Sequence, residues 1–204
     1  MKSLFLTSSF AEVSELFVKT TNNKLEGKRV TFIPTASINE EITFYVDAGK
    51  EALESQGLII DVLEISTAKE DEIISKINSN DFIYISGGNT FFLLQELKRT
   101  GTDRIIKGQI NAGKPFIGES AGSIVLSPNI EYIKEMDDYA SFSLESYDAL
   151  NLINFYPLPH YNDFPFQECT EKIVNEFDKK VTLVPFNNTQ AIVVSGEEYK
   201  LITT

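Results

Sequence analysis

The stretch Pro115-Phe116-Ile117-Gly118-Glu119-Ser120-Ala121-Gly122 decides the fold class of this chain. It ends one apolar run, and a second apolar run follows at residues 124–126, which indicates a buried strand that turns directly into a helix. Glycines on both sides of Ser120 permit a turn too tight for larger side chains. Such a Gly-x-Ser-x-Gly turn is either a nucleophile elbow, with the serine hydroxyl facing a cleft, or an ordinary turn of small residues. The other residues of the chain must decide between these two interpretations.

Short apolar runs alternate with longer amphipathic runs along most of the chain. The alternating segments before the Ser120 turn are residues 4–7, 11–21, 30–33, 40–56, 58–63, 69–78, 82–85, 90–99 and 103–111. Alternation of this kind is typical of βα units, so it predicts an α/β fold with a mostly parallel sheet.

The rhythm changes after the Ser120 turn. Residues 127–150 are polar and acidic with scattered aromatics, which predicts loops and short strands over the mouth of a cleft. Regular patterns then predict strands at residues 155–158 and 181–184, a helix at 166–177, and a C-terminal β-hairpin that pairs 191–194 with 199–203. The sequence contains no internal repeat and no linker-like composition, so residues 1–204 are interpreted as a single domain.

The composition excludes several classes of partner. The chain has 18 basic and 30 acidic residues, a formal net charge of −12, and no block of lysine or arginine, so nucleic acid is not an expected partner. No run approaches the roughly eighteen apolar residues of a membrane span. Cys169 is the only cysteine, which rules out an internal disulfide and suits a reducing compartment, and we expect a cytoplasmic protein. A single histidine and scattered carboxylates predict neither a metal site nor a cofactor.

A serine nucleophile needs a base, and the only histidine is His160. It follows the predicted strand at 155–158, and the ends of strands are where functional residues gather in an open parallel sheet. The imidazole in turn needs a group that fixes its tautomer, and the sequence leaves six carboxylates open for that role. They are Glu131, Glu135, Asp137, Asp138, Glu145 and Asp148.

A second turn of interest is Ser86-Gly87-Gly88-Asn89-Thr90, between the predicted strand at 82–85 and an apolar helix. Glycines at a strand-to-helix turn let backbone N–H groups approach a developing negative charge. We therefore expect an oxyanion hole that combines the N–H groups of Gly88 and Ala121. The structural alternative is a tight turn capped by Asn89 or Thr90.

Four motifs together resemble the peptidase E family, the aspartyl dipeptidases and their relatives among the serine peptidases. The motifs are SGGNT at 86–90, GESAG at 118–122, SYDALNL at 146–152 and PLPH at 157–160. The resemblance implies a flavodoxin-like, doubly wound fold related to class I glutamine amidotransferase domains, with a serine where those have a cysteine. It also implies Ser120 as nucleophile, His160 as base, and an oxyanion hole made by the Gly88 and Ala121 amides.

Two positions differ from the best-known members of that family. Those members carry an aspartate just before a methionine as the triad acid, whereas Glu135 precedes Met136 here, so Glu135 is the predicted acid, with Asp137 and Asp138 as alternatives. Aspartyl dipeptidases also carry an arginine after the histidine that suits an acidic side chain, and this chain has no arginine after Arg104. The predicted protein is thus a serine peptidase for small peptides without a strict preference for an amino-terminal aspartate.

Two further functions are compatible with the same residues. The first is an esterase or amidase that uses the Ser-His-Glu arrangement on a non-peptide acyl group. The second is a binding protein that keeps the cleft without efficient turnover.

Overall fold

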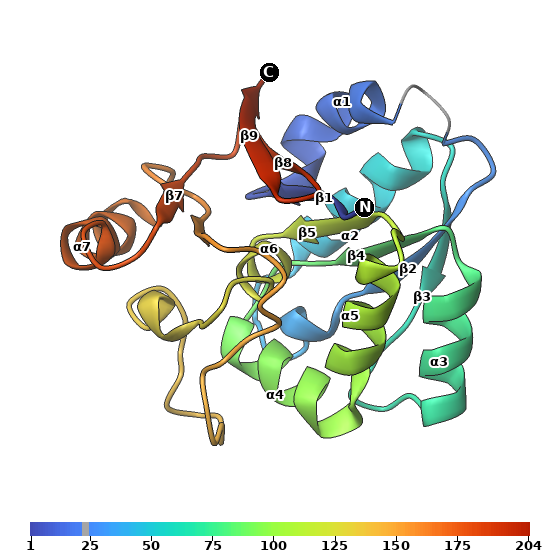
Figure 1. Cartoon of the computed structure of the whole chain (residues 1–204), viewed down its shortest axis with the longest axis horizontal. Helices are drawn as coiled ribbons and strands as arrows, with labels where there is room; N and C mark the ends of the chain where they lie inside the picture. Colours follow the sequence, from blue (N-terminus) through green and yellow to red (C-terminus); the bar gives the residue numbers. More distant parts are fainter. Residues whose placement is uncertain (22–24) are drawn as a thin grey trace.

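The main sheet is mixed and mostly parallel, as the sequence predicts. The computed structural model describes residues 1–21 and 25–204, and over these residues the sheet has seven strands in the order β3-β2-β4-β5-β1-β8-β9 (Figure 1). These strands are β1 (Ser3–Thr7), β2 (Arg29–Ile33), β3 (Ile59–Val62), β4 (Phe82–Ile85), β5 (Phe116–Glu119), β8 (Gln190–Ser195) and β9 (Glu198–Thr203). Strands β1 to β5 pair in parallel, so their carboxyl ends meet at one edge of the sheet.

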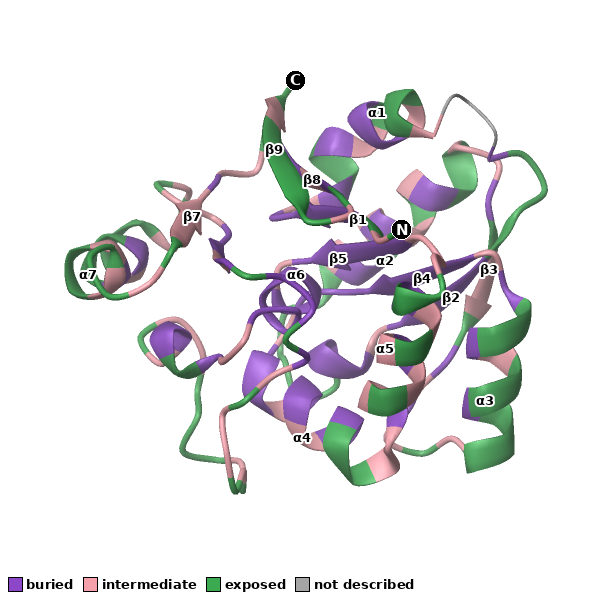
Figure 2. Ribbon diagram, viewed as in Figure 1, coloured by how far each residue is buried: buried purple, intermediate pink, exposed green. Residues whose placement is uncertain are grey.

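Helices cover both faces of this sheet, which confirms the doubly wound architecture. In the described residues they are α1 (Phe10–Thr20), η1 (Thr35–Ser37), α2 (Phe44–Ser55), α3 (Glu70–Ser79), α4 (Thr90–Thr100), α5 (Thr102–Asn111), α6 (Ala121–Ile124), η2 (Glu131–Ile133) and α7 (Gln167–Phe177). Helices α1 and α2 pack on one face, and α3, α4 and α5 pack on the other. Figure 2 shows the central strands buried between these two layers.

Alternate side chains of each central strand enter the two cores. Leu4 and Leu6 of β1 pack with the α3, α4 and α5 side, whereas Phe5 packs with the α1 and α2 side. Tyr84 of β4 is fully buried on the α1 and α2 side, where it stacks on Phe32 with ring centroids 4.7 Å apart. The central strands have continuous apolar sequences because helices cover both faces of the sheet.

The predicted C-terminal hairpin is present and extends the sheet. β8 and β9 pair antiparallel from Ser195 with Glu198 to Gln190 with Thr203. β8 also pairs antiparallel with β1, so the hairpin covers the edge that the parallel strands would otherwise leave open.

The region after the Ser120 turn is irregular, and its apolar side chains pack into the same core as α3, α4 and α5. Residues 127–155 contain η2 and an isolated antiparallel bridge between Asn129 and Asp148, and otherwise loops and turns, in agreement with the sequence. The predicted strands beyond it are β6 (Tyr156–Leu158) and β7 (Leu183–Pro185), which pair in parallel outside the main sheet. The carboxyl ends of β6 and β7 therefore lie side by side, and this brings His160 close to the segment that follows Pro185.

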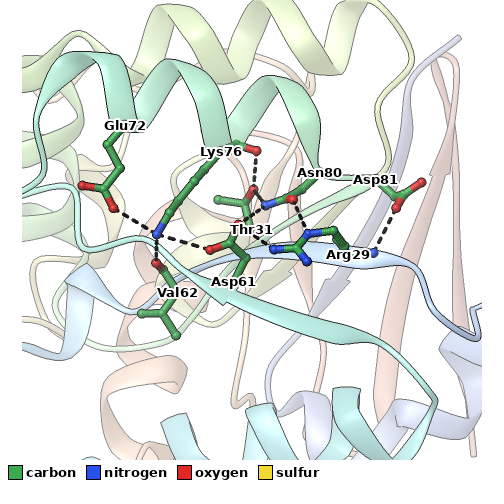
Figure 3. A network of polar contacts seen from close by, with 8 residues as sticks. All are labelled: Arg29, Thr31, Asp61, Val62, Glu72, Lys76, Asn80 and Asp81. Carbon is green, nitrogen blue, oxygen red and sulfur yellow. Dashed lines mark hydrogen bonds and ion pairs between the residues drawn. The ribbon is translucent and has the colours of Figure 1, made fainter.

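A network of charged and polar side chains joins the end of α3 to β2 and β3, and it includes Arg29 at the amino end of β2 (Figure 3). We call Arg29, Thr31, Asp61, Lys76 and Asn80 the amino-edge network. The Asp61 carboxylate accepts a hydrogen bond from Asn80 Nδ2 at 3.0 Å and forms ion pairs with Lys76 Nζ at 3.2 Å and Arg29 Nη2 at 3.3 Å. Thr31 Oγ1 accepts from Asn80 Nδ2 at 2.9 Å and donates to the Lys76 carbonyl at the same distance. These bonds tie the end of α3 to β2 and β3.

Candidate active site

Ser120 lies on a strained turn at the carboxyl end of β5. Between β5 and α6 it has φ 49° and ψ −107°, a left-handed backbone that residues other than glycine rarely adopt. Its N–H donates a hydrogen bond of 2.8 Å to the Thr7 carbonyl at the end of β1. A Cβ atom on Gly122 would lie 2.2 Å from the Ile85 carbonyl oxygen, so only glycine lets α6 pack this closely against β4. The turn therefore has the tight strand-to-helix geometry expected from its glycines.

His160 contacts Ser120 directly. Its Nε2 lies 3.0 Å from Ser120 Oγ, although 40 residues separate the two in the chain. The backbone of His160 also has a positive φ, 59°, and its N–H donates to Ser8 Oγ at 3.0 Å. The imidazole stacks on the Phe166 ring, with centroids 4.7 Å apart and planes inclined by 23°. Ser8 thus holds the backbone of His160, and the Phe166 ring orients its imidazole.

The second ring nitrogen of His160 contacts an amide instead of a carboxylate. Nδ1 lies 2.8 Å from Asn188 Oδ1, in the segment that follows β7. Since an amide oxygen only accepts hydrogen bonds, this contact places the proton on Nδ1 and leaves Nε2 free to accept from Ser120. The Asn188 N–H in turn donates to Asp163 Oδ2 at 2.7 Å, and the Asp163 N–H donates to the His160 carbonyl at 3.0 Å.

The glycine turn after β4 lies against Ser120. A Cβ atom on Gly87 would stand 3.3 Å from Ser120 Cβ. Gly88 has φ 129°, and a Cβ atom there would lie 2.2 Å from the Ala36 carbonyl oxygen, so this position also requires glycine. The Asn89 side chain accepts a hydrogen bond of 2.9 Å from the first turn of α4. Asn89 therefore caps α4, as expected for an ordinary tight turn, and this capped turn lies next to Ser120.

The backbone N–H groups of Gly88 and Ala121 lie in the two turns that meet at Ser120. Over residues 1–21 and 25–204, neither the Gly88 nor the Ala121 N–H donates to an acceptor of the protein. Ala121 opens α6, where the first N–H groups of a helix have no intrahelical partner. Both amides are thus free to donate to another group.

Comparison with known proteins gives the family of this chain. The sequence profile of Peptidase family S51 matches residues 4–202. The chain belongs to peptidase family S51. A relative from Listeria monocytogenes named uncharacterized peptidase Lmo0363 is 57% identical over 199 residues, 97% of either chain. Peptidase E of Shewanella amazonensis is 35% identical over 65% of this chain and 54% of its own.

A solved structure supports the same assignment. The crystal structure of a putative peptidase E protein from Listeria monocytogenes superposes with a TM-score of 0.95 at 54% identity, covering all of this chain and 99% of the other. The resemblance to peptidase E is therefore confirmed, and this family S51 member is a serine-type peptidase.

The structure of the S51 peptidase does not bring Glu135 to the imidazole. Glu135 lies on the surface with 55% of its side chain exposed, and its carboxylate is 3.8 Å from Lys172 Nζ on α7. Nδ1 of His160 instead contacts Asn188. The predicted Ser-His-Glu arrangement thus differs from the observed contacts, because His160 meets the segment after β7 and Glu135 follows η2.

Four of the other five candidate carboxylates have different partners. Asp137 Oδ2 accepts the Thr90 N–H, Asp138 binds Ser141 and the Ala140 N–H, Glu131 pairs with Lys134, and Asp148 accepts from Asn129. Glu145 is exposed. Within the described part of the chain, none of the six carboxylates is hydrogen-bonded to His160.

Asn188 is the residue of the site that sequence reasoning missed. The available signal was the predicted strand at 181–184, because a parallel partner for the strand at 155–158 has its carboxyl end beside His160. Sequence alone does not say that these two strands pair with each other.

Burial sets the charge state of His160 in this S51 peptidase. It lowers the pKa of His160 below its usual value, and the hydrogen bond with Asn188 and the charge of Asp163 oppose only part of that decrease. The imidazole is therefore neutral at pH 7, which is the form that can accept a proton from serine.

One side of the Ser120 turn is acidic. The Tyr45 ring lies 3.4 Å from the position that a Cβ of Gly87 would take, next to Ser120. Burial raises the pKa of the Tyr45 phenol, and nearby carboxylates, including Glu40 and Asp137, raise it further. Burial also raises the pKa of Asp137, to about 6. Among the described residues, no basic side chain forms an ion pair with Glu40 or Asp137.

Over residues 1–21 and 25–204, no three histidine, cysteine or acidic side chains lie together as metal ligands. The described helices include none that is long and apolar enough to cross a bilayer.

Proposed function

We propose that this S51 peptidase hydrolyses small peptides through an acyl-enzyme on Ser120. In the proposed reaction Ser120 Oγ attacks the scissile carbonyl carbon while His160 Nε2 takes the hydroxyl proton. The imidazolium then gives that proton to the leaving amine, and water, activated by His160, hydrolyses the acyl-Ser120 ester. The observation that carries the proposal is the 3.0 Å contact between Oγ and Nε2 at a strained turn.

The oxyanion is assigned to two backbone donors. The Gly88 and Ala121 N–H groups have no protein acceptor among the described residues and come from the two turns that meet at Ser120. Donors fixed before the reaction stabilise the negative charge that develops on the carbonyl oxygen. We therefore retain the oxyanion hole predicted from the sequence.

The group that orients the base is assigned to Asn188. Its Oδ1 fixes the tautomer of His160 but carries no charge, so it stabilises the imidazolium less than a carboxylate would. Asp163 accepts the backbone N–H of Asn188. Its negative charge supplies part of the stabilisation of the imidazolium. The proposed triad is Ser120, His160 and Asn188, in place of the Glu135 arrangement.

Neutral or cationic peptides are the proposed substrates. Glu40 and Asp137 make the surroundings of the Gly87 turn negative, and no arginine follows Arg104 in the chain. A substrate carboxylate would be repelled there without a guanidinium to receive it. Preference for an amino-terminal aspartate is thus not expected.

The test is hydrolysis of a dipeptide panel with aspartate, asparagine, leucine, alanine or lysine at the amino terminus. Ser120→Ala should lower kcat at least about 10⁴-fold, because the nucleophile and base act as a unit. The matched control is Ser9→Ala, at the same sheet edge, whose side chain makes no capping hydrogen bond and whose loss should leave turnover unchanged. Equal hydrolysis by wild type and Ser120→Ala would refute the mechanism.

An aryl ester in the same panel tests the esterase alternative. Turnover of the ester without any peptide cleavage would assign an esterase that uses the same residues. Absence of both activities, together with no labelling of Ser120 by a fluorophosphonate, would assign a binding protein.

A further inference from the structure

A buried carboxylate that the proposed chemistry does not use lies directly before Ser120. Glu119 is only 2% exposed. Its Oε1 accepts the Phe10 N–H at 2.9 Å, and its Oε2 accepts the Tyr84 hydroxyl at 2.7 Å. Burial raises the pKa of Glu119, while these two hydrogen bonds and the Gly87 backbone oppose the rise. Because burying a carboxylate is costly, an apolar side chain would fill this space better if filling were its only role.

One of these hydrogen bonds leads toward the base. Phe10 opens α1, two residues after Ser8, whose Oγ accepts the His160 N–H. The Glu119 to Phe10 bond therefore fixes the start of α1, and with it the loop that holds the backbone of His160. A carboxylate at this position also suits the positive end of a helix.

The other hydrogen bond leads toward the glycine turn. Tyr84 lies in β4, three residues before Gly87, which packs against Ser120 Cβ. Gly49 of α2 keeps space for the Tyr84 hydroxyl, since a Cβ at residue 49 would lie 2.7 Å from that oxygen. The carboxylate thus connects β5 to both of its neighbours, β1 through the α1 loop and β4 through Tyr84.

We propose that Glu119 is a positioning residue for the reaction. It sets the distance of Ser120 from His160 on one side and from the Gly87–Gly88 turn on the other, and it does not itself contact the substrate. This inference rests on the proposed function. Since the geometry of attack tolerates little displacement, the effect of losing Glu119 should fall on kcat and not on KM.

Two variants of similar size test the proposal in the full-length protein. Glu119→Met fills the same volume without an acceptor and should lower kcat about 10²-fold, with KM changed less than about twofold. Glu119→Gln should recover most of that loss, because its amide oxygen can accept the Phe10 N–H and its NH₂ group can donate to Tyr84 Oη. Equal kcat values for Glu119→Met and wild type would overturn the proposal.

A stability-matched control separates positioning from general damage. Thr31→Val removes one buried and one part-buried side-chain hydrogen bond from the amino-edge network without changing the size of the side chain. It should lower Tm and leave kcat unchanged. If Glu119→Met and Thr31→Val lower kcat equally at an equal loss of Tm, Glu119 has only a structural role. Tyr84→Phe, which removes a single hydroxyl, gives the same comparison if Glu119→Met does not fold.

A spectroscopic readout keeps this inference separate from the proposed function. The ¹⁵N chemical shift of His160 Nε2 reports the hydrogen bond with Ser120 and needs no substrate. It should change in Glu119→Met, or in Tyr84→Phe if that variant is used, and not in Thr31→Val. An unchanged shift would overturn the positioning role whatever the activity. A changed shift in a protein without peptidase activity would uphold it and refute only the proposed reaction.

Discussion

The amino-edge network beside β2 and β3 and the candidate site where β5 and β6 end, which we call the carboxyl edge, differ in their charge compensation and backbone strain. At the amino edge, the Asp61 carboxylate has three donors, and no residue of the amino-edge network has a positive φ (Figure 3). At the carboxyl edge, Ser120 and His160 both have left-handed backbones. Asp137 has no ion pair there among the described residues. Strain and uncompensated charge are thus concentrated where the reaction is proposed.

The pKa values of Asp61 and Asp137 are shifted in opposite directions. At Asp61, burial raises the pKa, but hydrogen bonds from Asn80, Lys76 and Arg29 outweigh it, so the pKa lies below 3.8. At Asp137, burial dominates and raises the pKa to about 6. Ionisation of Asp61 therefore stabilises the fold, whereas ionisation of Asp137 costs stability. The charge of Asp61 at the amino edge thus increases the stability of the fold, and the charge of Asp137 at the carboxyl edge decreases it.

The strongest way to break the carboxyl edge is Gly122→Ala. The new methyl group would overlap the Ile85 carbonyl, so α6 must move away from β4 and carry Ser120 with it. We expect a loss of about 2–3 kcal/mol in the free energy of unfolding and about 10²-fold or more in kcat/KM. Urea denaturation and dipeptide hydrolysis measure the two effects.

The matched control for this prediction is Gly108→Ala in α5. Nothing lies within 4 Å of the position that a Cβ would take there. Alanine should stabilise the helix by about 0.5–1 kcal/mol and leave kcat/KM unchanged. A Gly122→Ala variant as active as Gly108→Ala would show that the close packing of α6 on β4 is not needed.

At the amino edge, Asp61→Asn should reduce stability without affecting activity. The neutral amide loses the charge that Lys76 and Arg29 face, which we expect to cost about 1–2 kcal/mol at pH 7. Because the folded-state pKa of Asp61 is depressed, this contribution is present above about pH 4 and is lost as pH falls through the folded value. Urea denaturation of both proteins between pH 3 and pH 8 should show a gap that closes in acid. A gap that is constant with pH would mean that the charge of Asp61 is not responsible.

The fold could be predicted from the sequence because its signals are local. Each parallel strand is a short apolar run followed by an amphipathic one, and the hairpin of β8 and β9 turns on Ser195-Gly196-Glu197-Glu198. The prediction that Ser120 and Gly88 belong to one site has the same local basis, since each lies in a turn that follows a strand and parallel strands end at one edge. His160 is the predicted base because the chain has no other histidine, and the structure places its Nε2 3.0 Å from Ser120 Oγ.

The partner of His160 could not be predicted, because it depends on a long-range pairing. Asn188 reaches the imidazole only because β6 and β7, three residues each, pair in parallel outside the main sheet. Triad chemistry also favours a carboxylate beside the imidazole, so the residue types of the sequence do not indicate a neutral amide for this role. The resemblance to peptidase E predicts Glu135 from its place before Met136, whereas in the structure its carboxylate faces Lys172 on the surface.

Asp137→Asn should have the opposite effect to Asp61→Asn. The ionised carboxylate costs stability as pH rises from about 4 to about 6, because its folded-state pKa is raised above the unfolded value. Asparagine removes that cost and keeps an oxygen that can accept the Thr90 N–H. We expect a gain of about 1–2 kcal/mol at pH 8, with no difference near pH 3.5. Loss of stability at pH 8 in urea denaturation would contradict the assignment of Asp137 as a destabilising charge.

The smallest expected effect concerns the pH dependence of the base. The acid limb of kcat/KM follows the pKa of His160 in the free enzyme, so it should lie below pH 6.5. Asp163→Asn keeps an acceptor for the Asn188 N–H but removes the charge that raises the pKa of His160. The limb should then move to lower pH, by roughly half a unit or less. Asp178→Asn, at the exposed end of α7, should leave the limb in place, and a limb that moves equally in both variants would assign the shift to the net charge of the protein instead of to Asp163.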